Sequence, residues 1–168
     1  MFFLSLIVLN GQGASHNYGN LKIHEEGAIG FYHSLINDGI MDENQGVAGF
    51  YSDNSLIISG AFRPIFNDIE VIAANDLVLE VGVGVTNNAN FILGDVETPR
   101  TLSKINLEFI SGSYYNGEAQ MTKVNGYAAI TNKQNFIFPI GDLDKLRPLE
   151  LSSESINTTA KSAYFFEP

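Results

Sequence analysis

Two groups of acidic residues have the side chains that a calcium site needs. Asp38, Asp42 and Glu43 lie close together in the sequence, and Asp142 and Asp144 form the second group. Calcium binds about six to eight oxygen atoms from carboxylates and carbonyls, so each group is a candidate metal site. Neither group has the spacing of an EF-hand loop or of a nonapeptide calcium repeat. The alternative interpretation is that these acids lie in solvated turns.

Other reactive residue types do not form a catalytic pattern. His16, His24 and His33 lack the serine, cysteine or spaced carboxylates that would indicate a catalytic triad or a zinc site. The segment 82–85, Gly-Val-Gly-Val, is not followed by the Lys-Ser or Lys-Thr of a phosphate-binding loop. We therefore expect no catalytic residues, no enzyme activity and no cofactor other than a calcium ion.

Adjacent aromatic residues allow two interpretations. The pairs are Phe31 with Tyr32, Phe50 with Tyr51, and Tyr114 with Tyr115. Exposed aromatic rings would provide a platform on which sugars stack, because they combine broad apolar contact with a polar hydroxyl. Aromatic residues that recur at a repeat spacing are more often stacked inside a core. The sequence favours the core and leaves the sugar platform open.

Composition and charge limit the classes of partner. The 168 residues correspond to one domain, or to one domain and part of a second. Hydrophobic residues make up 45% of the chain and charged residues 17%, so the chain can bury a core. Nine Lys and Arg against nineteen Asp and Glu give a formal net charge of -10. This charge would repel phosphate backbones and anionic lipids, so nucleic acid is not an expected partner.

The N-terminal residues 1–14 have the pattern of a secretory signal peptide. The apolar run from Phe2 to Leu9 is followed by small and polar residues of the type found at cleavage sites. No Lys or Arg precedes the run, and a buried first strand is the alternative. The run is far shorter than the roughly 20 residues that cross a bilayer, so we expect no transmembrane segment. Localisation outside the cell, secreted or at the cell surface, is the resulting prediction.

Short strands joined by tight turns are predicted for the rest of the chain. Sixteen Gly, many Asn and Asp turns and the absence of helical periodicity indicate an all-β protein. The expected strands are 21–23, 28–32, 35–37, 47–51, 56–59, 69–73, 77–81, 90–93, 95–98, 104–110, 126–131, 135–139, 149–152 and 163–166.

A short internal repeat predicts how these strands are arranged. Residues 30–39 begin Gly-Phe-Tyr, and residues 49–60 begin with the same three residues. A spacing of roughly 20 residues is typical of solenoids, in which stacked coils bury a shared interior. We predict a right-handed parallel β-helix-like solenoid over residues 15–103, with an irregular β-sandwich as the alternative. A smaller C-terminal β unit is expected over residues 104–168, in a chain that is a fragment of a longer protein.

A motif near the C-terminus is interpreted as structural. Its residues are Phe136, Phe138, Pro139, Gly141, Asp142, Arg147 and Pro148. The two phenylalanines lie two residues apart on a strand and so point inward together, and the proline ends the strand because it lacks an N–H. The arginine is expected to form a salt bridge with Asp142 and Asp144 that holds the turn.

The same segment resembles large secreted surface proteins of Bacteroidota. Val124 to Tyr127 matches the pattern V-x-G-Y, Phe136 to Asp142 matches F-x-F-P-[IV]-G-D, and Arg147 with Pro148 supplies a following R-P. Proteins of this kind often carry a C-terminal sorting domain for type IX secretion or gliding motility. The resemblance covers about a quarter of the chain and implies export within a multidomain protein, without catalytic residues.

These observations together predict a non-catalytic, adhesin-like module of a secreted or cell-surface protein. A carbohydrate-binding module is the first alternative, and a β-helix enzyme acting on polysaccharides is the second. Expected partners are the other domains of a longer parent chain and an extracellular glycan or protein surface.

Overall fold

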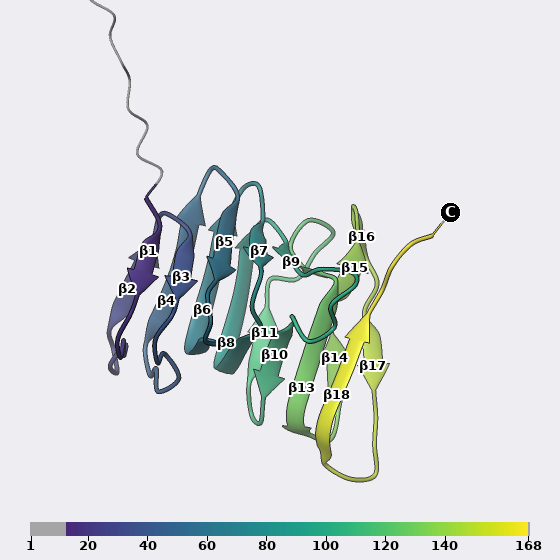
Figure 1. Ribbon diagram of the computed structural model, residues 1–168. Helices are drawn as coiled ribbons and strands as arrows, with labels where there is room; N and C mark the ends of the chain where they lie inside the picture. The colour runs from purple at the N-terminus through teal and green to yellow at the C-terminus, as the bar shows by residue number, and fades with distance from the viewer. Residues whose placement is uncertain (1–12, 168) are drawn as a thin grey trace, which may run out of the picture.

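A computed structural model describes residues 13–167, and in this part of the chain every regular element is a β-strand. Stacked parallel strands form a β-solenoid of about six turns. Figure 1 shows the coils stacked side by side, from β1 and β2 in purple to β18 in yellow. The predicted all-β solenoid is therefore confirmed. Parallel pairing between successive coils replaces the hairpins that a β-sandwich would require.

Two sheets form the walls of the solenoid. The short-strand sheet contains, in spatial order, β1 (Ser15–Asn17), β3 (Leu35–Asn37), β5 (Leu56–Ser59), β7 (Leu77–Leu79), β9 (Val96–Glu97), β12 (Val124–Asn125), β15 (Ile140–Asp142) and β16 (Lys145–Leu146). The long-strand sheet contains β2 (Ala28–Phe31), β4 (Val47–Ser52), β6 (Ile65–Ala73), β8 (Val83–Leu93), β10 (Leu107–Ile110), β13 (Tyr127–Lys133) and β18 (Asn157–Ala163), and β11 (Tyr114–Asn116) also pairs with β8. A separate antiparallel pair joins β14 (Phe136–Phe138) and β17 (Leu149–Leu151).

The core lies between the two sheets and is filled by residues at alternate strand positions. Phe31 and Phe50 are register partners on β2 and β4, and their rings stack with centroids 5.0 Å apart. Phe66 packs edge-on against Phe50 at 5.8 Å. From the opposite sheet, Leu56 pairs with Leu77, and both side chains are buried. Because successive residues of a strand point to opposite faces, the same strands leave a second set of side chains on the outer surface.

One corner of the solenoid requires glycine. Gly60 ends β5 with φ +119°, a conformation that L side chains rarely adopt. A Cβ atom at this position would also lie 2.3 Å from the carbonyl oxygen of Asn37 in the neighbouring coil. The tight turn after β5 therefore depends on the absence of a side chain.

The expected boundary at residue 103 does not coincide with a break in either sheet. On the far side of this position, β10 pairs in parallel with both β8 and β13, and β12 pairs in parallel with both β9 and β15. Parallel stacking thus continues to Asp142, and this corrects the placement of a separate unit from residue 104. The pattern of short strands is interrupted there, because residues 98–106 form the irregular connection from β9 to β10.

Antiparallel strands close the C-terminal end of the stack. β16 turns back along β15, and β18 runs antiparallel to β13. The outermost strand β18 has the polar sequence Asn-Thr-Thr-Ala-Lys-Ser-Ala. A polar terminal strand is the kind of cap that a solenoid needs, because it covers the last coil without offering an apolar edge.

Several expected strands differ from the observed ones. Residues 21–23 form no strand, although the Leu21 N–H donates to the Ile40 carbonyl across the coils. The last expected strand at 163–166 is displaced, because β18 ends at Ala163. The predicted signal peptide lies almost entirely in residues 1–12, outside the described residues. Within residues 13–167, no helix has the length and apolar character to cross a membrane.

Candidate binding face on the long-strand sheet

A row of outward-facing residues runs across the long-strand sheet from coil to coil. Register places five positions side by side, one on each of β2, β4, β6, β8 and β11, and this central row consists of Gly30, Gly49, Glu70, Asn90 and Asn116. Neighbouring strands in a sheet lie about 4.8 Å apart, so the row is a regular array along the solenoid axis. Buried residues such as Phe50 and Val71 alternate with it and point into the core.

Two tyrosine rings lie over the glycines of this row. A Cβ atom at Gly49 would lie 2.1 Å from the Cζ and Oη atoms of Tyr51, and one at Gly30 would lie 3.1 Å from Tyr32 Cε2. The ring centroids of Tyr32 and Tyr51 are 5.7 Å apart. Tyr32 is 66% exposed. Neither glycine has a positive φ, so the space above the backbone, not the backbone conformation, is what requires glycine here.

Hydrogen bonds link the side chains of the central row into a ladder. The Tyr51 hydroxyl donates to Glu70 Oε1 at 2.9 Å, and Asn90 Nδ2 donates to Glu70 Oε2 at 3.1 Å. Asn116 Nδ2 donates to Asn90 Oδ1 at 2.6 Å. Burial and the hydrogen bond to Glu70 raise the pKa of Tyr51 to about 12, so the phenol remains a donor. The ladder holds three polar side chains in fixed positions next to the tyrosines.

A second row, called the side row, runs beside the first. Asp68, Asn88 and Tyr114 are register partners on β6, β8 and β11. Asp68 accepts hydrogen bonds from Asn67 Nδ2 at 2.8 Å and from Asn87 Nδ2 at 2.6 Å. Asn88 Oδ1 is buried and has no hydrogen-bond partner within residues 13–167. Tyr114 is 53% exposed, so the face has an aromatic side chain at each end.

The three aromatic pairs divide between the core and this face. Phe31 and Phe50 are buried and stacked, as the repeat spacing predicts. Tyr115 packs against Phe109, with centroids 5.6 Å apart. The other member of each pair, Tyr32, Tyr51 or Tyr114, belongs to the outer face, because adjacent strand residues point in opposite directions. The core interpretation therefore describes one member of each pair, and the other member faces outward.

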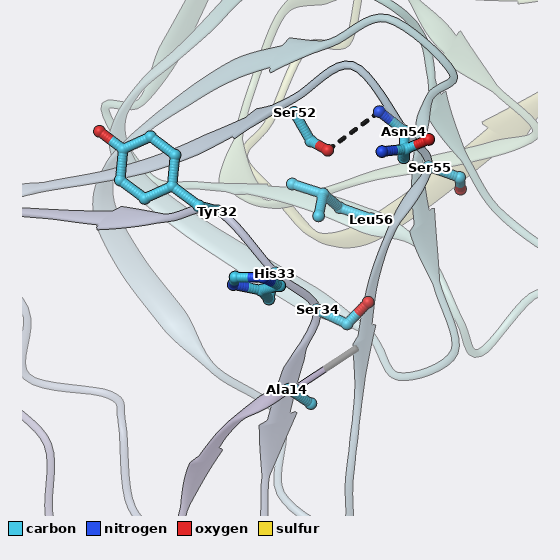
Figure 2. A pocket seen from close by; sticks show the side chains of 9 residues that line it. Ala14, Tyr32, His33, Ser34, Ser52, Asn54, Ser55 and Leu56 are labelled. Atoms are coloured by element: carbon cyan, nitrogen blue, oxygen red, sulfur yellow. Dashed lines mark hydrogen bonds between the residues drawn. The ribbon is translucent and has the colours of Figure 1, made fainter. Parts of the chain in front are cut away.

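A surface cleft lies beside Tyr32, at the corner where the long-strand sheet turns into the short-strand sheet. It has a volume of about 340 Å³ and is lined mainly by polar residues of two successive corners, 32–34 and 52–56, and by Gly13 and Ala14. Figure 2 shows His33 and Ser34 on one side of the cleft, with Ser52 and Asn54 on another. The Asn54 N–H donates to Ser52 Oγ at 3.0 Å, which fixes the second corner.

The first acidic group is not assembled into a metal site. Asp38 accepts hydrogen bonds from His16 Nε2 at 2.7 Å and from the Ala61 N–H at 2.8 Å. The hydrogen bond from His16 is the main cause that lowers the pKa of this carboxyl. Asp42 and Glu43 are exposed, and Glu43 contacts Lys22 at 3.4 Å. Within residues 13–167, no group of three or more His, Cys, Asp or Glu side chains is placed to hold a metal ion.

The second acidic group is divided between the interior and the surface. Asp142 is buried and accepts hydrogen bonds from Arg100 at 2.6 and 2.5 Å and from the Phe166 N–H at 2.8 Å. These donors occupy the oxygens that a calcium ion would need. Asp144 is exposed and contacts Lys145 at 3.4 Å.

The predicted salt bridge of Arg147 with Asp142 and Asp144 is not the one that the structure has. Its guanidinium donates to the Leu146 carbonyl at 2.9 Å, and Arg100 takes its place beside Asp142. The long connection after β9 brings Arg100 across the fold, 42 residues from its partner in sequence. Proximity along the chain was therefore a poor guide to the partner of Asp142.

The rest of the C-terminal motif has structural positions. Phe138 is buried, and Phe136 packs against Phe109 with centroids 4.9 Å apart. Pro139 separates β14 from β15, and its carbonyl accepts the Val124 N–H at 2.8 Å. Two further members are Gly141, where a Cβ atom would lie 2.0 Å from the Lys145 carbonyl oxygen, and Pro148, which lies between β16 and β17.

Sequence reasoning did not identify the polar residues of the binding face. Glu70, Asn90 and Asn116 have no local motif, and their signal is positional. Glu70 and Asn90 continue the recurrence that begins at Gly30 and Gly49, at intervals of roughly 20 residues, whereas Asn116 lies 26 residues after Asn90. Alignment of the coils by this recurrence, combined with strand alternation, would have placed Glu70 and Asn90 on one face.

Comparison of the chain with known proteins was made at three levels. No protein-family model matches it, and no curated protein and no solved structure matches it. The geometry of the solenoid and of its outer face is therefore the basis for a functional assignment.

Proposed function

We propose that this protein is a non-catalytic, adhesin-like module that binds carbohydrate through the outer face of the long-strand sheet. The proposal rests on one observation: the rings of Tyr32 and Tyr51 cover Gly30 and Gly49, next to the hydrogen-bond ladder that begins at Glu70. We call the surface formed by these two rings the tyrosine bed. A sugar ring has an apolar face of C–H groups and a rim of hydroxyls. Tyrosine rings suit the first, and fixed carboxylate and amide groups suit the second.

The polar groups on this face are already oriented. Each oxygen of Glu70 accepts a hydrogen bond from a neighbouring side chain, as does each oxygen of Asp68. A carboxylate oxygen has more than one lone pair, so each can also accept a sugar hydroxyl. Binding then requires little ordering of side chains, and this reduces its entropic cost.

We place this module outside the cell, as part of a longer secreted or cell-surface protein. Support comes from the apolar run at residues 2–9 and from the resemblance of the segment 124–149 to Bacteroidota surface proteins. The net charge of -10 is compatible with a saline exterior. Within that segment, Phe138 and Gly141 are buried, which supports a structural role for these two positions.

A glycan array with the purified protein tests the proposal. We expect binding by the wild type and a loss of about tenfold or more in affinity for Tyr51→Ala, because the ring and its hydrogen bond to Glu70 are both removed. The matched control is Tyr18→Ala, which removes a tyrosine that is 75% exposed but lies beyond β1 on the short-strand sheet. No binding by the wild type, or equal losses for the two variants, would reject the proposal.

A polysaccharide-acting enzyme is the second candidate, and it rests on one observation. Asp68 and Glu70 are two residues apart on β6 and point to the same outer face. Two carboxylates flanking a glycosidic bond are the machinery of most glycosidases. Incubation of the wild type with a bound glycan separates the two functions. Release of reducing ends that Glu70→Gln abolishes would establish the enzyme, and an unchanged glycan would leave the binding module.

A further inference from the structure

We infer that the ligand is an extended β-1,4-linked glycan without acidic groups, which lies along the solenoid axis with one sugar ring per strand. This inference rests on the proposed function, because it names the class of carbohydrate for the same face. It follows from the spacing of the central row, the straight course of the tyrosine bed and the distribution of charge.

The spacing of the central row sets the direction of the chain. Its five positions lie on five neighbouring strands, β2, β4, β6, β8 and β11, with a step of about 4.8 Å from one to the next. One pyranose ring in an extended β-1,4-linked chain advances by nearly the same length. A glycan that lies across the strands therefore meets an equivalent position at every ring.

The straight course of the bed selects an extended glycan over a coiled one. At the β2 end, the rings of Tyr32 and Tyr51 cover two glycines that are register partners, with their planes tilted by 49°, and Tyr51 continues directly into Glu70. An extended β-1,4-linked chain follows a straight line, so successive sugar rings can contact these side chains in turn. An α-1,4-linked glucan curves into a helix and would leave the row after a few rings.

The charge on the face excludes acidic glycans. Asp68 and Glu70 contribute two carboxylates, and the remaining polar members of the central and side rows are the amides Asn88, Asn90 and Asn116 and the phenol Tyr114. These two rows contain no Lys or Arg. Arg63, beside Gly84 of β8, forms a salt bridge with Glu108 at 2.6 Å. Uronate or sulfate groups would meet only like charge, which disfavours binding.

Titration calorimetry with oligosaccharides of increasing length tests the inference. The probes are the β-1,4-linked glucose and N-acetylglucosamine series, from the disaccharide to the hexasaccharide, together with maltohexaose and a hexamer of galacturonate. In at least one β-1,4-linked series, we expect affinity to rise with each ring up to the pentasaccharide and then to remain constant. Maltohexaose and the galacturonate hexamer are expected to bind at least about tenfold more weakly.

A variant at the far end of the row gives an independent reading. Asn116→Ala removes the last position of the row, and the one side-chain hydrogen bond that it loses within residues 13–167 is to Asn90, so the fold should be kept. We expect the affinity for the pentasaccharide to fall to that of the tetrasaccharide, while the affinity for the disaccharide falls by a smaller factor. An equal loss at all lengths would overturn the inference.

The failure of this inference is distinguishable from that of the proposed function. Binding to array glycans with no rise beyond the disaccharide, or with equal affinity for maltohexaose or galacturonate, rejects the axial β-1,4 arrangement alone. Binding to array glycans without binding to either β-1,4-linked series does the same. An absence of binding to all glycans rejects both.

Discussion

The early coils of the solenoid are held together by apolar stacking, and the late coils add buried charge to it. In the coils that contain β2 to β9, apolar side chains stack from one strand to the next, as Phe31, Phe50 and Phe66 do on one wall. Leu56 and Leu77 do the same on the other wall. Each buried side chain of this size contributes roughly 1.5–3 kcal/mol through removal of apolar surface from water.

The late coils add buried charge to an apolar core that includes Phe109, Ile130 and Phe138. Lys123 is completely buried and donates to Asp95 Oδ2 at 2.6 Å, to the Gln120 carbonyl at 2.8 Å and to the Leu143 carbonyl at 2.7 Å. All three N–H groups of the ammonium therefore have acceptors. Burial raises the pKa of Asp95, and the charge and hydrogen bonds of Lys123 oppose this shift. The ammonium joins the connection between β11 and β12 to the turn between β15 and β16.

This difference follows from the partners that the connections find. In the early coils, the connection at residues 38–46 pairs its backbone with the neighbouring coils: the Ile40 carbonyl accepts the Leu21 N–H, and the Met41 carbonyl accepts the Ile65 N–H. The carbonyls of Arg100 and Gln120, in the late connections, accept from side chains instead. The proposed binding face lies mainly on the early coils, whose strands pair in parallel. Irregular coils could not provide a row with a constant step.

Loss of the buried ammonium is expected to have the largest effect on stability. Lys123→Ala leaves Asp95 buried without its cation and two carbonyls without a donor, which should cost about 3–5 kcal/mol of unfolding free energy. Urea denaturation measures this cost. The matched control is Lys145→Ala, whose exposed contact with Asp144 at 3.4 Å should contribute no more than about 1 kcal/mol. Equal costs for the two variants would show that charge does not hold the late coils.

Truncation of the early core is expected to have an effect nearly as large. Phe50→Ala removes the ring that contacts both Phe31 and Phe66, and should cost about 3 kcal/mol or more of unfolding free energy. Tyr51 is the next residue and faces outward, so Tyr51→Ala should cost much less unfolding free energy while it lowers the glycan affinity about tenfold or more. Urea denaturation of both variants measures the contrast. Similar destabilisation by the two would contradict the division of this strand into an inner and an outer face.

Acid is expected to weaken the late coils through Asp142. Burial raises the pKa of the Asp142 carboxyl, but the hydrogen bonds from the Phe166 N–H and from Arg100 outweigh it, so the pKa lies below its ordinary value of 3.8. A carboxyl whose folded pKa is lowered stabilises the fold above its ordinary pKa, and that contribution is lost as the pH falls through the folded value. The midpoint temperature of thermal unfolding of the wild type should therefore decrease when the pH is lowered below about 4.

Asp142→Asn separates this group from other acids. The variant should be less stable than the wild type at pH 7, because the ion pair with Arg100 is lost. The difference in thermal midpoint between the two proteins should shrink as the pH falls below about 4, where the wild-type carboxyl becomes protonated. A constant difference from pH 7 to pH 2 would show that the ionisation of Asp142 does not matter for folding.

The regular part of the molecule was predictable from sequence, and the irregular part was not. The recurrence of Gly-Phe-Tyr at 30–32 and 49–51 was sufficient for the solenoid, because stacked coils need equivalent residues at equivalent positions. Strand alternation already implied that Phe50 and Tyr51 face opposite sides. Lys123 carries no such signal, since its sequence surroundings are those of an exposed turn. The partners of Asp95 and Asp142 depend on long-range connections whose paths are set only in three dimensions.

The smallest expected change in stability is at Gly49, and it tests the binding face most directly. In Gly49→Ala, the new Cβ would lie within 2.1 Å of the Tyr51 ring, so the ring must swing away from its bed and from Glu70. The cost should stay within about 1 kcal/mol, because the displaced atoms belong to the far end of an outward side chain and Ala restricts the unfolded chain.

Glycan affinity should nevertheless fall nearly as far as in Tyr51→Ala, although every tyrosine is still present. Titration calorimetry measures this loss. Gly112→Ala is the matched control, because a Cβ atom at that position would meet nothing within 4 Å. Full binding by Gly49→Ala would show that the Tyr51 ring does not have to lie over a bare glycine backbone. The close contact between a bare backbone and an aromatic ring would then be a detail of packing, and the regular spacing of the coils would lose its functional reason.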